Sequence, residues 1–271
     1  MKLMKTSQIK SIARRQLKGT RIQAFSVILM TFFIMLSIQL LEAVCRYSFA
    51  IPATLQFDYK NIILTAVWLL VSMLLLWPVS IGKTKYFLSL AVAGKGKKSN
   101  LFAYFSTGRS YFKTIVTTLI TSLMVLCTLF FSIIPGMLLL FWGNGHTISI
   151  DVTLQLTGIF LLITASAVTV RVALGLALVP YLLVKEHKLL PVAIIRRSQK
   201  LMKGNRLRVL YLFISFIGWF FLCLFIVPIF YALPYYEASM AVLAQQMTGK
   251  KEQEEREIYS TIEFQKLVSQ V

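Results

Sequence analysis

The sequence predicts an all-α polytopic membrane protein with about six transmembrane helices. Of its 271 residues 57% are hydrophobic and only 14% are charged, whereas soluble domains average about 25% charged residues. The apolar residues form long runs, each close to the roughly 20 helical residues that cross a bilayer core of about 30 Å. The runs are continuous rather than alternating, which favours helices over a β-barrel.

We expect the spans to pair as three hairpins that leave the cytoplasmic side and return to it. The expected spans are 23–46, 61–82, 114–142, 153–185, 208–226 and 228–247, all in one membrane domain, 1–247, followed by a polar cytoplasmic tail, 248–271. The first run is longer than the roughly 7–15 apolar residues of a signal peptide and lacks a small-residue cleavage site. A single helix over 209–247 would be about 58 Å long, so we divide it near Pro228. The alternative is five spans followed by an external amphipathic segment.

The charge distribution predicts the orientation. Twenty-two of the 29 Lys and Arg residues fall in the segments 1–21, 83–113 and 185–208, and the intervening loops, 43–61 and 143–153, hold two. Short cytoplasmic loops carry an excess of Lys and Arg, so we expect a multi-pass protein of the cell membrane with a cytoplasmic N-terminus. The net charge of +19 then fits the anionic inner leaflet. No groove-reading or base-stacking motif for nucleic acid is visible.

A short motif recurs beside two apolar runs. Residues 17–22, LKGTRI, match residues 202–207, MKGNRL, and Gly108-Arg109 gives a looser third copy. Apolar residues at helical spacing precede both close copies and predict amphipathic helices: Ile9, Ile12, Ala13 and Leu17, then Ile194, Ser198, Leu201 and Met202 after Pro191. Glycine accepts the left-handed conformation that ends a helix. We therefore expect two amphipathic helices at the cytoplasmic interface, each turning at its glycine into a span.

Two sets of charged residues are candidates for function. The cations of the two close copies are candidate contacts for anionic lipid headgroups: Lys18, Arg21, Lys203, Arg206 and Arg208. Arg171 lies in mid-span, where an arginine costs about 2.5–3.5 kcal/mol and usually faces a partner or a watery cavity. Glu237 is a better candidate partner for it than Glu42, which lies toward the outer end of its span. Backbone carbonyls freed at Pro180 or Pro234 are a third option. Arg171 therefore has either a structural role, in a pair or by reaching the surface of a locally thinned bilayer, or a role in a site for an anionic ligand.

The sequence contains no arrangement that indicates catalysis or metal binding. Cys45, Cys127 and Cys223 are far apart without metal-ligand spacing. His146 and His187 fall on opposite predicted membrane faces, which disfavours zinc. No phosphate-binding glycine loop, paired carboxylates or Ser-His-Asp pattern occurs. We therefore expect no enzyme and no cofactor.

Six motifs carry a family resemblance. They are IARRQLKGTR at 12–21, PVSIGKTKYFLSLAVAGK at 78–95, LFAYF at 101–105, IIPG at 133–136, SQKLMKGNRLRVLYLFISFIGWFFL at 198–222 and LPYYEASMAVLA at 233–244. In this order they resemble the bacterial integral-membrane family catalogued as domain of unknown function 975. The chain departs from it at 225–228, FIVP, where the family usually has a glycine-containing turn. The resemblance implies a membrane fold and no established activity.

The features together favour a non-catalytic protein that binds membrane lipid or a partner membrane protein. The alternative is a transporter or permease subunit for lipid or small molecules, because internal repeats are common in transporters and broken helices mark their sites. The candidate breaks are Pro135-Gly136, Gly175 with Pro180, and Pro228 with Pro234.

Overall fold

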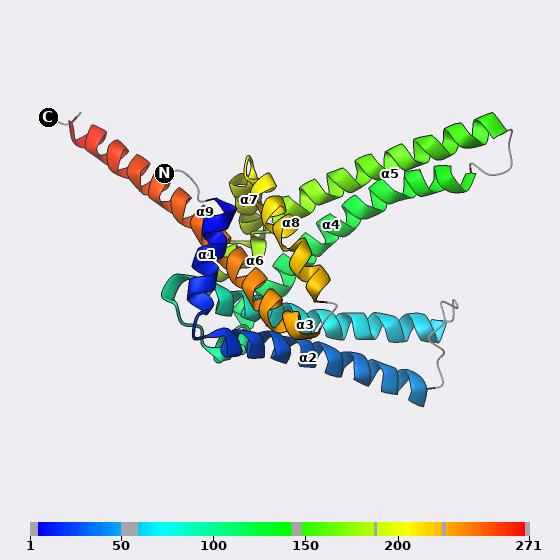
Figure 1. Ribbon diagram of the computed structural model, residues 1–271, viewed down its shortest axis with the longest axis horizontal. Coiled ribbons are helices and arrows are strands. Elements are labelled where there is room, and N and C mark those ends of the chain that lie inside the picture. Colours follow the sequence, from blue (N-terminus) through cyan, green and yellow to red (C-terminus); the bar gives the residue numbers. More distant parts are fainter. Residues whose placement is uncertain (1–4, 50–58, 143–147, 187–188, 224–225, 269–271) are drawn as a thin grey trace. The chain divides into compact units, whose positions relative to one another are not determined.

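The computed structural model describes residues 5–49, 59–142, 148–186, 189–223 and 226–268, and every element in these ranges is helical (Figure 1). The elements are α1 Thr6–Leu17, α2 Arg21–Ser48, α3 Tyr59–Ala93, the 3₁₀ helix η1 Lys98–Phe102, α4 Gly108–Trp142, α5 Ile148–Leu176, α6 Val179–Lys185, α7 Pro191–Met202, α8 Arg206–Leu222 and α9 Ile226–Val268. The predicted all-α class is confirmed.

Four stretches of the described chain are long and apolar enough to cross a membrane, or five if the bent pair α7–α8 counts as one span. The four are Arg21–Ser48, Tyr59–Ala93, Gly108–Phe141 and Asp151–Lys185. A break separates α8 from α9 close to the expected division at Pro228. Helix α9 carries Glu237 in its apolar part and continues into the polar tail as one helix, and it is not among the candidate spans of the described residues.

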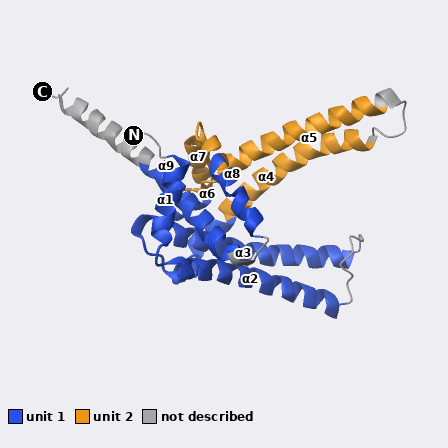
Figure 2. Cartoon of the chain, viewed as in Figure 1, with its two compact units in different colours: residues 1–115, 180–187, 211–271 blue, residues 116–179, 188–210 orange. Residues whose placement is uncertain are grey.

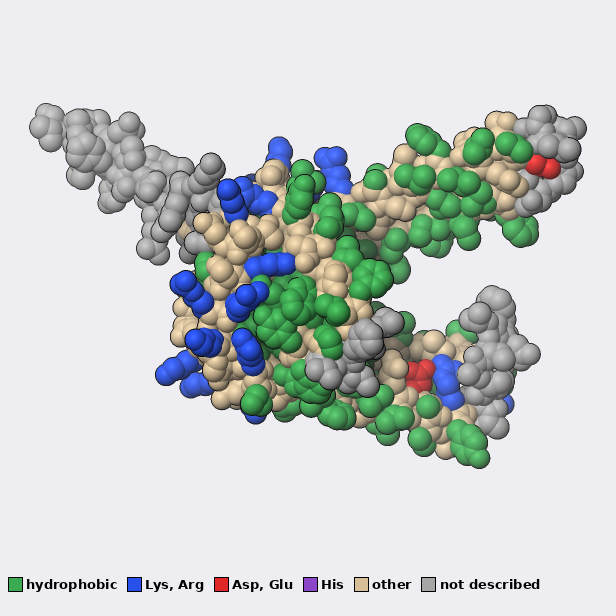
Figure 3. Space-filling view, viewed as in Figure 1, with side chains coloured by type: hydrophobic (Ala, Val, Ile, Leu, Met, Phe, Trp, Pro, Cys, Tyr) green, Lys and Arg blue, Asp and Glu red, His purple; other side chains and the backbone are tan. Residues whose placement is uncertain are grey.

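The chain divides into two compact units, which we describe one at a time (Figure 2). Unit 1 comprises residues 1–115, 180–187 and 211–271, and unit 2 comprises 116–179 and 188–210. In unit 1, Lys and Arg side chains gather over the compact part around α1, whereas hydrophobic side chains cover the α2–α3 hairpin (Figure 3). This distribution within unit 1 is compatible with a membrane-embedded α2–α3 hairpin next to a positively charged region.

Helix α9 is the centre of unit 1. Between Ala232 and Thr248 nearly all of its side chains are buried or half-buried, as is typical of a helix enclosed on all sides. The apolar face of α1 packs here: Ile9, Ala13 and Leu17 are at most 3% exposed. We expected α1 to be an amphipathic helix at the cytoplasmic interface. The structure adds that its apolar face contacts protein, because α9 offers an apolar surface that the pattern of α1 alone does not reveal.

Helix α3 continues past the expected end of the second span at residue 82. Residues 83–93 remain helical, and Tyr86, Phe87 and Leu90 are fully buried in unit 1. The helix also packs tightly on η1, because a β-carbon on Gly82 would lie 2.0 Å from the carbonyl oxygen of Leu101. The basic segment that we expected to be a loop is therefore partly a buried helix end.

The two close copies of the motif fold in the same way. Lys18 (φ −66°, ψ 115°) and Lys203 (φ −63°, ψ 117°) have nearly identical backbone angles, and left-handed glycines follow them, Gly19 at φ 91° and Gly204 at φ 83°. Helices α7 and α8 meet at 81° across this turn. The predicted turn at glycine is confirmed. The third copy differs, because Gly108 begins α4 and follows η1 rather than an amphipathic α-helix.

Unit 2 contains most of α4, together with α5, α7 and the start of α8. Gly136 on α4 and Gly158 on α5 face each other closely, since a β-carbon on Gly158 would lie 3.0 Å from the carbonyl oxygen of Gly136. Helix α5 ends at Leu176, near the predicted break at Gly175 and Pro180. The buried Ser198 hydroxyl of α7 donates a 2.8 Å hydrogen bond to the carbonyl of Gly175. This bond fixes α7 against the end of α5.

Candidate functional site

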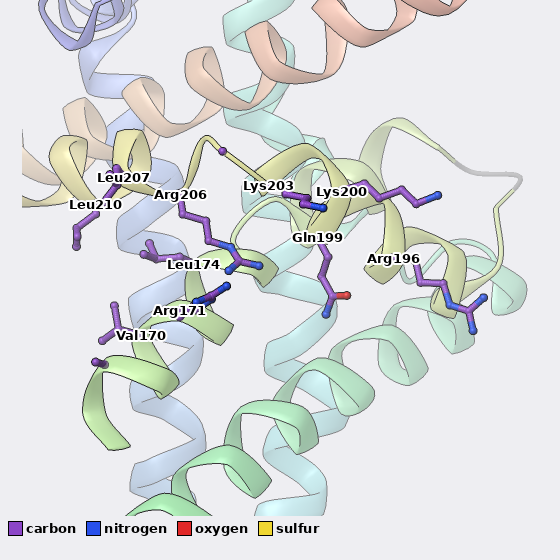
Figure 4. Close-up of a pocket in the computed structure, with 12 residues that line it drawn as sticks. Val170, Arg171, Leu174, Arg196, Gln199, Lys200, Lys203, Arg206, Leu207 and Leu210 are labelled. Atoms are coloured by element: carbon purple, nitrogen blue, oxygen red, sulfur yellow. The ribbon is translucent and has the colours of Figure 1, made fainter. Parts of the chain in front are cut away.

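A pocket of about 840 Å³ lies in unit 2 between α5, α7 and the start of α8 (Figure 4). Its volume is in the range of about 300–1,000 Å³ that is usual for ligand sites. Its lining, which we call the basic pocket, is Ala167, Val170, Arg171, Leu174, Arg196, Gln199, Lys200, Lys203, Gly204, Arg206, Leu207 and Leu210. One part of the pocket lining is cationic and another part is aliphatic.

The charge of the basic pocket is entirely positive. Its lining includes five Lys or Arg residues and no Asp or Glu. Within the described ranges, none of the five forms an ion pair with a carboxylate. Five like charges around one space repel one another unless an anion compensates them. The geometry therefore favours a negatively charged ligand.

Two arginines form the inner part of the pocket. Arg206 begins α8, and its guanidinium lies beside Gly175, with Nη2 3.6 Å from the position that a β-carbon would take there. Its Nε is buried and has no hydrogen-bond partner among the described atoms. Arg171, from α5, is exposed and points into the same space (Figure 4). A buried donor without a partner needs an explanation, and a bound oxyanion would provide one.

Local structure explains why α7 lines this pocket with cations. The buried face of α7 consists of Ile194, Ile195, Ser198, Leu201 and Met202. Three pocket residues of the same helix, Arg196, Gln199 and Lys200, follow the i, i+3, i+4 spacing of a second face, and Lys203 follows directly as the C-cap. Packing of the first face on the protein thus leaves the second face free to present its charges.

The first copy of the motif provides an internal comparison. Arg21 occupies the position of Arg206, and its guanidinium carbon lies 5.3 Å from the ring centre of Tyr231. Lys10 lies 4.2 Å above the ring of Phe216 and donates a 2.9 Å hydrogen bond to the carbonyl of Ser215. Burial, with the adjacent positive charge of Arg14, lowers the pKa of Lys10. Arg21 of the first copy and Lys10 of the preceding helix thus have partners within the chain, whereas the Nε of Arg206 has none among the described atoms.

The structure groups only some of the residues that the sequence singled out. Arg171, Lys203 and Arg206 all line the basic pocket, whereas Lys18 and Arg21 belong to unit 1 and Arg208 is not part of the lining. Arg196, Gln199 and Lys200 were missed, although their spacing on an amphipathic helix was a usable signal.

Glu237 has a partner in unit 1. It forms a 2.5 Å ion pair with Lys83, and both side chains are about four-fifths buried, with 20% and 22% exposed. The pair that we expected between Glu237 and Arg171 would join the two units and stays a prediction. Among the described residues, no group of three or more His, Cys, Asp or Glu could hold a metal ion. His146 and His187 lie outside the described residues.

These features define a class of protein: an all-helical chain whose several long apolar helices are compatible with a membrane-embedded protein, with a cationic pocket in one unit. The model of the family described as "Protein of unknown function (DUF975)" matches residues 1–251. The chain therefore belongs to this family, as its motifs indicated. No curated protein and no solved structure matches it.

Proposed function

We propose that this chain is a non-catalytic protein of the cell membrane whose basic pocket binds the headgroup of an anionic inner-leaflet lipid. One observation carries the proposal: five cations from α5, α7, α8 and the turn between α7 and α8 line a single pocket without a carboxylate in its lining. Arginine binds phosphate with two parallel charge-assisted hydrogen bonds, and the aliphatic part of the wall suits the adjoining hydrocarbon.

The repeated motif offers a matched test of this proposal. The variant Lys203→Gln/Arg206→Gln removes two charges from the basic pocket, and Lys18→Gln/Arg21→Gln removes the equivalent two charges from unit 1. Retention of phosphatidylglycerol in mild detergent is measured by native mass spectrometry, with phosphatidylcholine as the neutral reference. We expect only the first variant to lose retention. An equal loss in both variants would mean that charge in general, rather than this pocket, holds the lipid.

The proposal includes six spans with a cytoplasmic N-terminus, supported by the separation of basic from non-basic loops in the sequence. Single cysteines at Ser99 and Asn205, in a background without native cysteines, should resist a membrane-impermeant thiol reagent in intact cells. A cysteine at Asn144 should react. The reverse pattern would refute the orientation, and reaction at Ser269 would indicate five spans.

A partner membrane protein is the other binding function that we consider. Purification in mild detergent separates the two, because a partner would copurify in a fixed molar ratio whereas a lipid would appear as a small added mass. A stoichiometric protein in place of phospholipid would overturn the lipid proposal.

A transporter or permease subunit is the second candidate function. It is favoured by the end of α5 at Leu176, in mid-run, and by the Ser198 hydroxyl that bonds the carbonyl of Gly175 there. Transporter sites are often formed by interrupted helices, whose free backbone carbonyls bond to other groups, as the carbonyl of Gly175 does here. Movement of labelled lipid or solute across reconstituted vesicles, lost in Arg171→Gln, would favour transport over binding alone.

A further inference from the structure

A second hollow adjoins the basic pocket within unit 2. It measures about 630 Å³ and is lined by Met124, Cys127, Thr128, Val168, Arg171, Val172, Gly175, Gln199 and Arg206. Three residues, Arg171, Gln199 and Arg206, line both spaces. The two arginines therefore stand at the boundary between two cavities rather than at the end of one.

The spacing along α5 explains this arrangement. Ala167, Val170, Arg171 and Leu174 line the basic pocket, and Val168, Arg171, Val172 and Gly175 line the second hollow. Each set has the i, i+3, i+4, i+7 spacing of one stripe along a helix. Arg171 belongs to both stripes, so it stands between the two spaces, and aliphatic residues of α5 line each space beside it.

We propose that the ligand is a two-chain anionic phospholipid whose phosphate lies on Arg171 and Arg206 and whose acyl chains enter the two spaces separately. This inference rests on the proposed function and specifies the ligand of the same site. A phospholipid has one phosphate next to the point where its two chains diverge, and the two spaces here share the two arginines while their other lining residues differ except for Gln199. Free phosphate would use the arginines only, and a lysophospholipid would fill only one space.

The test compares ligands that differ in one part at a time. The delipidated full-length protein is mixed in mild detergent with phosphatidylglycerol, lysophosphatidylglycerol or phosphatidylcholine at equal mole fraction, or with inorganic phosphate. Native mass spectrometry measures bound lipid, and thermal unfolding measures stabilisation. We expect phosphatidylglycerol to bind about tenfold more tightly than the one-chain lipid, phosphatidylcholine to bind weakly, and phosphate to stabilise little.

Tryptophan substitutions test the two spaces separately. Val168 in the second hollow and Val170 in the basic pocket are 51% and 46% exposed, so a larger side chain can occupy each space without disturbing a core. Val168→Trp or Val170→Trp should reduce phosphatidylglycerol binding to the level of the one-chain lipid. The control is Val152→Trp, since Val152 is 48% exposed on the same helix and lines neither space.

The outcomes separate this inference from the function on which it rests. Equal binding of the two-chain and one-chain lipids, both lost in Arg171→Gln/Arg206→Gln, would overturn the two-chain ligand and keep the lipid site. Absence of any anionic-lipid binding would overturn both. Stabilisation by inorganic phosphate equal to that by phosphatidylglycerol would identify a free-phosphate site and overturn both lipid proposals.

Discussion

The contact between Gly82 and Leu101 gives a sharp test of unit 1. A β-carbon at Gly82 would lie 2.0 Å from the Leu101 carbonyl oxygen and 2.6 Å from its carbonyl carbon. Ordinary contact begins near 3.4 Å, so η1 would need to retreat by about 1.4 Å. The obstacle is backbone, which cannot rotate aside as a side chain can. Gly82→Ala should therefore force α3 and η1 apart.

We expect this variant to lose about 1–3 kcal/mol of stability, the usual cost of overpacking a well-packed interior. For a chain of this size 1 kcal/mol changes Tm by about 2–4 °C, so Tm should fall by about 2–12 °C. The measurement is thermal unfolding in mild detergent. Heated samples are run on size-exclusion chromatography, and the fluorescence of the monodisperse peak gives the fraction of protein that remains folded. The loss would come from packing alone, because alanine is the better helix former.

The matched control is Gly218→Ala. Gly218 lies inside α8, and nothing lies within 4 Å of the position of its β-carbon. Alanine in a helix interior is about 0.5–1 kcal/mol more favourable than glycine, so this variant should keep or raise Tm. If Gly82→Ala were as stable as the control, α3 and η1 could not pack as closely as described.

Three further predictions concern other contacts. Gly136→Val should lower Tm by an amount similar to Gly82→Ala, because its β-carbon would press on α5; an unchanged Tm would argue against this helix crossing. Lys83→Leu and Glu237→Leu should each destabilise the protein, and the double variant should lose less than their sum by about 0.5–3 kcal/mol. Coupling of Glu237 to Arg171→Leu instead would support the pair inferred from sequence. Burial raises the pKa of Tyr104 from 10.0 to about 12, so its contribution to stability is complete below pH 10 and lost as pH rises toward 12. Tyr104→Phe should flatten this part of the pH–stability curve, and an identical slope in both proteins would contradict the burial.

Local features of the fold could be predicted from the sequence because they depend on neighbouring residues. Glycine after a short amphipathic segment predicted the turns at Gly19 and Gly204, and both adopt the left-handed conformation. Apolar spacing identified the buried face of α7, and Pro191 begins this helix as expected. Each of these features follows from residues within one or two helical turns.

Features that depend on distant residues could not be predicted in the same way. The burial of α1 on α9 and the ion pair of Lys83 with Glu237 join segments more than 150 residues apart. The same limit applies to the candidate site. Arg171 could be singled out as a costly charge in an apolar run, but its convergence with Arg206 depends on the packing of α7 against α5, which includes the hydrogen bond from Ser198 to Gly175.

The repeated turn has an evolutionary consequence. If the two copies arose by duplication, their arginines now have different surroundings. Arg21 of the first copy interacts with Tyr231, whereas Arg206 of the second copy lines the basic pocket. A change at Tyr231 would then be compensated within the chain, by its arginine. Changes around the second copy would be compensated by the ligand of the basic pocket. Related chains could therefore change their ligand preference there and keep the same fold.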